Sequence, residues 1–262
     1  MTFDELLNSV REGRDVVIPA SWGQGRATFG GLVAALAFDV MASKVASGRA
    51  MRAMQVSFVG PVEPDVPAVF EAELLREGKA VSQVQGRILQ NGETRLACLA
   101  SFGGDRESSV QVAPSPAPAA APVNQCQELP YIPGVTPEFT QHIDMRWAFG
   151  NMPFSGKGGR DMGGWMQFRE TPSALTDAHI VALVDAWPPA LLPHLKGPAP
   201  ASSLSWALEI VHPRPTMKPG EWLLYRATID QAGAGYGHTH AGIWTESGEL
   251  VALSRQTVTV FG

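Results

Sequence analysis

The sequence predicts an α+β fold built from two similar halves, in each of which an antiparallel sheet wraps around a mostly apolar helix. Three observations favour this class. The order of helix and strands in the first half returns in the second. The helix segment at 29–45 lacks a polar stripe, so it must be enclosed nearly all round. A strand–helix–strand alternation is absent, which argues against a parallel, doubly wound sheet.

The repeat is defined by matching helices, prolines and turns. In each half a strand passes through a proline, Pro61 or Pro213, and a tight turn precedes the last strand. The matching segments are helices at 29–45 and 173–187, strands at 51–62 and 203–213, and last strands at 93–103 and 249–261.

Aligning the halves on these prolines and turn glycines shows where they differ. The alignment pairs Ser203 with Met51, Gln256 with Ala100 and, approximately, Asp185 with Val33. Polar residues in the second half thus stand where the first half has apolar ones. This is the pattern of a duplicated enzyme in which one active site has survived.

The helices follow from hydrophobic periodicity and capping. The uncharged stretch of the first long helix ends at Asp39, too short for a membrane span, which needs about 20 apolar residues. An apolar helix inside a curved antiparallel sheet explains it better, with a two-layer sandwich as the alternative. The N-terminus has no basic region before an apolar one, so we expect no signal peptide. Thr2 and Glu5 instead have capping-box spacing, which predicts a short amphipathic helix.

The strands follow from alternation and β-prone composition. Residues 54–59 alternate apolar and polar side chains, and residues 222–229 are rich in aromatic and branched types. Asn91-Gly92 predicts a hairpin, because both residues tolerate positive φ. Between the halves, a run of prolines and alanines at 113–122 predicts an extended linker. The expected domains are therefore 1–103 and 128–262, joined by the linker 104–127.

Composition limits the classes of function. The 262 residues are 45% hydrophobic and 17% charged, as in an ordinary globular protein. The formal net charge of −5 gives no basic surface for nucleic acid or membrane. The two cysteines, Cys98 and Cys126, suit a reducing compartment, so we expect a cytoplasmic protein.

Asp185 is the first candidate for chemistry. It stands in the last helical turn before Pro188, where the helix dipole disfavours negative charge. Its sequence neighbours are apolar, so burial is expected to raise its pKa towards that of a usable general base. The alternative is a helix-end acid that faces solvent.

Ser203 and Gln256 are the other two candidates. Ser203 opens a strand, with Ser205 expected on the same face, and Gln256 lies inside the last strand. An acid, a hydroxyl and an amide together can position a water for general-base hydrolysis without a covalent step. The alternative is a solvent-exposed strand face with no role in catalysis.

Other motifs are weaker. There is no G-x-S-x-G elbow, and Gly23–Gly31 lacks the ending of a P-loop, so its backbone N–H groups are better suited to a ligand oxygen at a helix start. The basic loop 156–160 is expected to be solvated, with phosphate binding as the alternative. His238 and His240 alternate on one strand without a third ligand, so we expect no metal, and the residues imply no cofactor.

The chain resembles the TesB-like (thioesterase II) family of acyl-CoA thioesterases, whose fold is a double hotdog. The resemblance covers most of both halves and rests on four segments in order: Thr28-Phe29-Gly30-Gly31, Leu75-Arg76-Glu77-Gly78-Lys79, Glu221-Trp222-Leu223-Leu224-Tyr225, and Gly248-Glu249-Leu250-Val251-Ala252 leading to Gln256. The resemblance implies a catalytic set of Asp185, Ser203 and Gln256, in which serine stands for the more familiar threonine. The segment Leu204-Ser205-Trp206 departs from the family's commoner Asp-His pair.

The resemblance also implies a substrate and its contacts. A fatty or aryl acyl-CoA would be hydrolysed to the free acid and CoA. Its thioester needs an oxyanion donor, from backbone N–H groups near Gly30 or Gly31 or from around Gln256. The aromatic walls would include Phe29, Trp165, Trp187 and Trp206, although each alone suits an ordinary core. The two halves would pack as a pseudo-dimer with sheets side by side, and such protomers are expected to form homo-oligomers.

Two other functions stay open. A non-catalytic acyl-CoA binding protein would keep only the acyl tunnel. A hotdog enoyl-thioester hydratase would need an Asp–His pair; His194 follows Asp185 but lies beyond three prolines, which disfavours this alternative.

Overall fold

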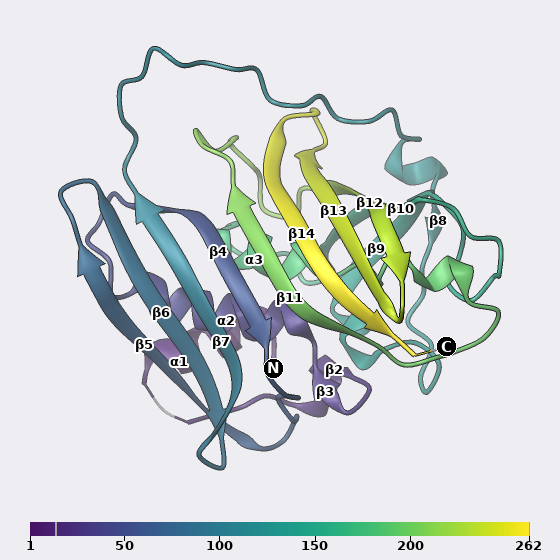
Figure 1. The fold of residues 1–262 in the computed structure, drawn as a ribbon, viewed down its shortest axis with the longest axis horizontal. Helices are drawn as coiled ribbons and strands as arrows, with labels where there is room; N and C mark the ends of the chain where they lie inside the picture. Colours follow the sequence, from purple (N-terminus) through teal and green to yellow (C-terminus); the bar gives the residue numbers. More distant parts are fainter. Residues whose placement is uncertain (14, 262) are drawn as a thin grey trace.

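The computed structural model describes residues 1–13 and 15–261. Within them, twelve strands form one antiparallel sheet that curves over three α-helices, α1 (Phe3–Arg11), α2 (Gly30–Ala42) and α3 (Asp177–Val184) (Figure 1). The strands lie in the order β1 (Val16–Val17), β5 (Pro67–Glu77), β6 (Val81–Gln90), β7 (Glu93–Gly103), β4 (Ala50–Phe58), β11 (Ala201–Ile210), β14 (Leu250–Val260), β13 (Tyr236–Thr245), β12 (Leu223–Gly233), β10 (Asp161–Phe168), β9 (Ile143–Phe149) and β8 (Gln127–Glu128). A separate hairpin joins β2 (Gly23–Gln24) to β3 (Ala27–Thr28).

The strand order confirms the predicted α+β class and the duplication. From β5 to β4 the first half has the same order as the second half from β12 to β11, and the halves meet where β4 pairs with β11. The two expected sheets are therefore joined edge to edge into one. In this central pair Gln55 lies opposite Ala207. Because β4 and β11 have the same place in their halves, a pseudo-twofold axis passes near that pair.

Matching β-bulges align the halves residue by residue. The register of β4 against β7 shifts between Met51 and Ala53, and that of β11 against β14 shifts between Ser203 and Ser205. Beyond the bulges, Met54 pairs with Ala100 and Trp206 pairs with Gln256. Ser203 thus corresponds to Met51 and Gln256 to Ala100, as the sequence alignment predicts.

The bulge also corrects one expectation. Ser203 lies opposite Val258 and Ser205 lies opposite Thr257. Directly paired residues share a face of the sheet, and neighbours along a strand alternate. Ser203 therefore shares the helix-facing side with Gln256, whereas Ser205 faces the other side. Leu204 is the extra residue that separates the two serines.

The approximate pairing of Asp185 with Val33 is wrong. Asp185 is the C-cap of α3, whereas Val33 lies in the first turns of α2. Measured from the N-caps Thr176 and Phe29, Asp185 corresponds in position to Phe38. The counterpart of the candidate site in the first half is still wholly apolar, with Phe38, Met51 and Ala100 all buried.

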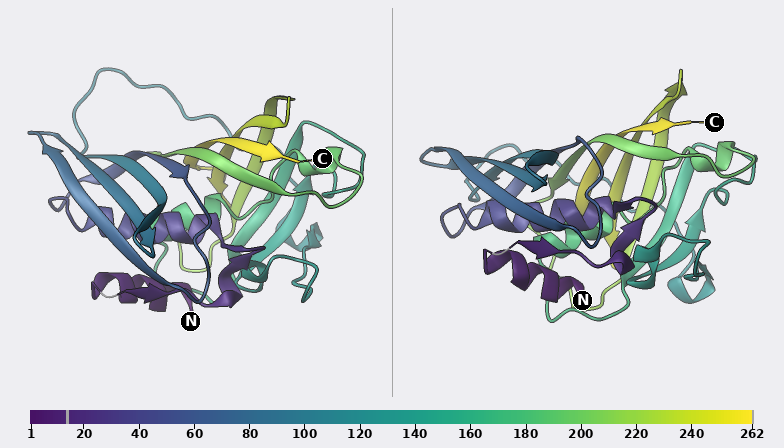
Figure 2. Two further views of the ribbon diagram at one scale, coloured as in Figure 1. Left: turned by 60° about the horizontal axis from the view of Figure 1, so that its bottom comes forward. Right: turned by 90° about the horizontal axis from the view of Figure 1, so that it is seen from below.

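Helix α2 is enclosed, which explains its missing polar stripe. Gly31–Phe38 and Met41 are all buried. The sheet strands β5, β6 and β7 cover one side, α3 packs alongside, and α1 lies on the side away from the sheet (Figure 2). The helix ends at Ala42, earlier than the predicted residue 45, and α3 is much shorter than the predicted 173–187. Thr176 caps the start of α3, and Asp185 already has a non-helical backbone.

Two local sequence signals, the N-terminal capping box and the Asn91-Gly92 hairpin turn, are confirmed. Thr2 and Glu5 form a reciprocal capping box at the start of α1. Asn91 and Gly92 both have positive φ, 53° and 78°, in the hairpin between β6 and β7. No helix in the described ranges has the length and apolar character that crossing a membrane requires.

The proline-rich linker covers the outer face of the second half. It crosses from the end of β7 towards β8 (Figure 1). Its carbonyl groups accept hydrogen bonds from two tryptophans of the sheet, Trp244 Nε1 to Ser115 O at 3.1 Å and Trp165 Nε1 to Ala121 O at 2.9 Å. Ala117 and Ala120 pack on the same apolar patch. Trp165 therefore belongs to the outer face and is not a wall of an acyl tunnel.

Candidate active site

Asp185 lies where the end of α3 meets the start of α2. The approach is close because α2 begins with two glycines. A Cβ atom on Gly30 would lie 2.7 Å from Asp185 Oδ2, and one on Gly31 would collide with the carbonyl oxygen of Ala182. The N-cap residue Phe29 has no side-chain hydrogen bond to α2. The backbone N–H groups at this helix start are thus available to Asp185 and to a ligand.

The carboxylate of Asp185 has two protein donors. Gln256 Nε2 donates to Oδ1 at 2.6 Å, and the backbone N–H of Gly31 also donates to the carboxylate. Burial raises the pKa of Asp185 to about 7, because it outweighs these two hydrogen bonds, which lower it. The group can therefore exchange a proton near neutral pH, as a general base requires.

Gln256 is held in the middle of the second half-sheet. It lies on β14 between Trp206 on β11 and Thr239 on β13, on the helix-facing side. Trp206 is fully buried, and its Nε1 donates to Ser254 Oγ at 2.9 Å. Trp206 thus packs beneath the strand that carries Gln256. Its predicted contact with substrate stays a prediction.

Ser203 lies near this pair but does not bond to it. It faces the same side as Gln256 and is its diagonal neighbour, because it lies opposite Val258. No hydrogen bond joins its hydroxyl to another residue in the described parts of the chain. Of the three predicted catalytic residues, the structure brings Asp185 and Gln256 into contact and leaves Ser203 with a free hydroxyl beside them.

The predicted substrate-binding residues fall into two groups. Gly30 and Gly31 are at the carboxylate, and the position of a Cβ on Gly30 is 3.1 Å from the ring of Phe58. Phe29 is fully buried and stacks on Phe139 with ring centroids 4.1 Å apart, so it is part of the core. Trp187, just after Asp185, stacks parallel to Tyr225 with centroids 6.2 Å apart.

Tyr225 and Thr239 are site residues that the sequence reasoning missed. Burial raises the pKa of Tyr225, and the negative charge of Asp185 raises it further, so the phenol is a neighbour of the carboxylate. Thr239 is buried opposite Gln256. Their strands are distant in sequence from Asp185, and only the strand pairing brings them to the site. The position of Tyr225 in the family-like segment 221–225 was the one available signal.

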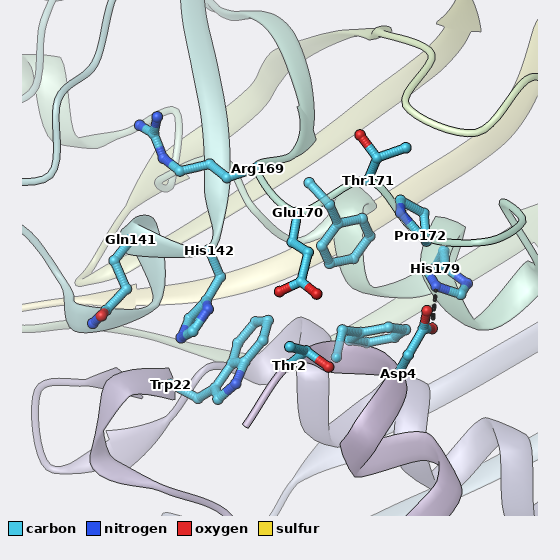
Figure 3. Close-up of a pocket in the computed structure, with 12 residues that line it drawn as sticks. Thr2, Asp4, Trp22, Gln141, His142, Arg169, Glu170, Thr171, Pro172 and His179 are labelled. Atoms are coloured by element: carbon cyan, nitrogen blue, oxygen red, sulfur yellow. Dashed lines mark hydrogen bonds and ion pairs between the residues drawn. The ribbon is translucent and has the colours of Figure 1, made fainter.

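A hollow lies at the other end of α3 from Asp185. It has a volume of about 150 Å³ and lies between α1 and the second half (Figure 3). Within it, His179 Nε2 bonds Asp4 Oδ1 at 2.9 Å, while Trp22 stacks on His142 with centroids 3.9 Å apart. His179 is in the first turn of α3, and Asp185 is its C-cap, so this hollow is separate from the candidate active site.

The remaining histidines form no metal site. His238 Nδ1 contacts Thr257 Oγ1 at 3.3 Å and His240 Nδ1 contacts Asp230 at 2.8 Å. Across residues 1–13 and 15–261, no group of three or more His, Cys, Asp and Glu side chains is placed to hold an ion.

Comparisons with known proteins identify related sequences and folds. The acyl-CoA thioesterase N-terminal domain matches residues 18–103, and the acyl-CoA thioesterase C-terminal domain matches residues 123–260. A search of curated proteins found no match. Both matched domains lie in their expected order along the chain.

Solved structures share the whole architecture. A protein of unknown function with a hot dog fold from Alicyclobacillus acidocaldarius is 21% identical, with a TM-score of 0.80 over 96% of this chain and 94% of that one. Acyl-CoA thioesterase II TesB2 from Mycobacterium marinum is 23% identical, with a TM-score of 0.72 over 90% of both chains. The tesB protein of Mycobacterium avium subsp. paratuberculosis is 16% identical, with a TM-score of 0.74 over 98% of this chain and 100% of that one. At these identities the likeness shows the double hotdog fold.

Proposed function

The chain belongs to the acyl-CoA thioesterase family, and we propose that it hydrolyses acyl-CoA with a water that Asp185 activates and Gln256 and Ser203 orient. The observation that carries the proposal is the Asp185 carboxylate, whose pKa is raised to about 7 between the Gln256 amide and the start of α2. A buried acid with this pKa can take a proton from water at neutral pH and return it to the leaving thiolate.

Each residue has a distinct part in the reaction. Gln256 holds Oδ1 of Asp185, which leaves Oδ2 on the side of Gly30 to accept the water proton. The Ser203 hydroxyl, free on the same face of the sheet, gives the water a second contact. The attack forms a tetrahedral carbon with a negative oxygen, which collapses as the C–S bond breaks and the thiolate takes the proton.

The start of α2 is suited to stabilise the oxyanion. Phe29 does not cap its N–H groups, of which that of Gly31 donates to Asp185, and Gly30 adds no Cβ that would block access. A helix N-terminus also carries partial positive charge. We assign the oxyanion contact to the backbone of Gly30, so that both halves of the molecule contribute to one site.

Thiol release from acyl-CoAs tests this function. We expect the wild type to release CoA from a panel of straight-chain and aryl acyl-CoAs, detected with a thiol reagent. Asp185→Asn keeps the shape of the side chain but removes the base, so turnover should fall about 100-fold or more. Circular dichroism and thermal unfolding serve as controls for folding. Full activity in the folded variant would refute the role of Asp185.

The same assay addresses the alternatives. Binding of acyl-CoA without any thiol release by the wild type would favour a binding protein. A hydratase has little support, because His194, the histidine that would complete an Asp–His pair, is exposed at the end of a short 3₁₀-helix, Leu192–His194, and bonds the carbonyl oxygen of Gly159 at 2.7 Å.

A further inference from the structure

Two polar groups beside Asp185 are not used by the protein. The side chain of Trp187 is only 5% exposed, and its indole nitrogen Nε1 is buried without a hydrogen-bond partner. The hydroxyl of Tyr225 has no hydrogen bond to any described residue, and Tyr225 is 7% exposed. An unpaired buried polar group costs about 1–3 kcal/mol. The Trp187 nitrogen is such a group, and the Tyr225 ring stacked beside it carries a second donor without a partner in the described chain, so the pair is suited to a ligand oxygen.

The two rings form one aromatic wall. They stack parallel, with an interplanar angle of 3° and centroids 6.2 Å apart, and Trp147 meets Trp187 edge-on at 5.3 Å. Tyr225 lies opposite Gly164 on β10, where no side chain competes for the space. Trp147, Trp187 and Tyr225 thus form one continuous aromatic surface.

The wall lies on the inner side of the site. Tyr225 belongs to the main core cluster between the sheet and α3, and Trp187 follows Asp185 by two residues. A coenzyme with charged phosphates cannot be enclosed in such surroundings without a large desolvation cost. The part of the substrate that meets this wall is thus the acyl group. Burial raises the pKa of the Tyr225 phenol, and the nearby charge of Asp185 raises it further, so the phenol remains a donor.

We propose that Trp187 Nε1 and the Tyr225 hydroxyl donate hydrogen bonds to an oxygen atom on the acyl group, so that the preferred substrates are acyl-CoAs with an oxygen substituent. The oxygen is a hydroxyl or a carbonyl on a chain or ring whose apolar surface packs on Trp147. This inference rests on the proposed thioesterase function and adds to it a substrate class. A plain fatty acyl group would leave both donors unpaired.

Matched substrates test the proposal. The assay compares octanoyl-CoA with 3-hydroxyoctanoyl-CoA, and phenylacetyl-CoA with 4-hydroxyphenylacetyl-CoA, by kcat/KM for thiol release and by calorimetric binding to Asp185→Asn. We expect the wild type to prefer the oxygenated member of at least one pair by roughly tenfold or more. Tyr225→Phe should remove most of that preference, with kcat/KM falling further for the oxygenated member of the pair than for the plain one.

Matched variants make the result specific. Tyr236→Phe removes a phenol that is 49% exposed at the far end of β13, and it should leave the preference unchanged. Trp187→Phe removes the second donor and carries the test if Tyr225→Phe does not fold. A wild type that treats both members of each pair alike overturns the proposal, as does a Tyr225→Phe variant that loses activity on both equally. If no substrate releases thiol, the thioesterase function fails, and the same preference measured by binding decides the inference.

Discussion

At Asp185 the end of one helix and the start of another act on a single carboxylate. The C-terminus of α3 disfavours its negative charge, whereas the N-terminus of α2 favours it. Burial is the largest effect and raises the pKa, and hydrogen bonds from Gln256 and Gly31 bring it partly back. The balance leaves a group that is half protonated near neutral pH.

This balance predicts a pH dependence of activity. Asp185 must be ionised to act as a base, so kcat/KM should rise from pH 5 to 8 with an apparent pKa of about 7. In Gln256→Ala the carboxylate loses a hydrogen bond that lowers its pKa, so the inflection should move upward and the plateau should fall. The measurement is thiol release across pH in buffers of constant ionic strength. An inflection near pH 4 in the wild type would contradict the buried-base assignment.

For single residues, the sequence indicated which side chains belong to the candidate site but not how they are arranged. Comparison of the two halves singles out Asp185 and Gln256, which are in contact. It also singles out Ser203, but alternation along the strand placed Ser203 and Ser205 on one face, because nothing in Leu204 marks a β-bulge. Tyr225 and Trp187 were not paired in the prediction, since their contact depends on the packing of a strand against a helix end.

Among the elements, the two glycines at the start of α2 decide how closely this helix approaches α3. Phe29 and Thr176 occupy the same N-cap position in the two helices, but only Thr176 takes part in a capping box, with His179. The start of α3 is thus closed by its own side chains, whereas the start of α2 is open towards Asp185. In the proposed mechanism, the uncapped start of α2 is the one that contacts the substrate.

Gly31→Ala tests this close approach. The new Cβ would collide with the backbone carbonyl of Ala182 and lie 3.0 Å from Asp185 Cβ, so α2 and α3 must separate. We expect a loss of about 1–3 kcal/mol in the free energy of unfolding, measured with urea, and a larger fractional loss of thiol release. Gly197→Ala is the matched control, because nothing lies within 4 Å of a Cβ there. Wild-type stability and turnover in Gly31→Ala would show that the contact is dispensable.

For the whole molecule, the candidate site is built from both halves of the duplication. The first half supplies the start of α2, and the second supplies Asp185, Ser203 and Gln256. The repeated order of helix and strands was enough to predict the side-by-side pseudo-dimer. The docking of the linker on the outer face was not predictable, because a proline–alanine run has no periodicity that indicates a partner. Trp165 was consequently assigned to the wrong side of the sheet.

The pseudo-twofold symmetry offers a matched pair of substitutions. Gln256 and Ala100 occupy corresponding places on β14 and β7, but Ala100 is fully buried opposite Met54 and Val84, and Phe38 stands where the second half has Asp185. Gln256→Ala should lower turnover by about tenfold to 100-fold with little change in stability, because it releases the general base from its fixed orientation.

Ala100→Gln should have the opposite effect. It places an unpaired amide in an apolar core, so the free energy of unfolding should fall by roughly 1–3 kcal/mol, while thiol release per folded molecule should stay near that of the wild type. Ala100→Ser is a milder version if the glutamine variant does not fold. Turnover and urea unfolding, measured on the same samples, separate the two effects. If a folded Ala100 variant lost turnover as Gln256→Ala does, the first half would contain working catalytic machinery and the assignment of a single surviving site would be wrong.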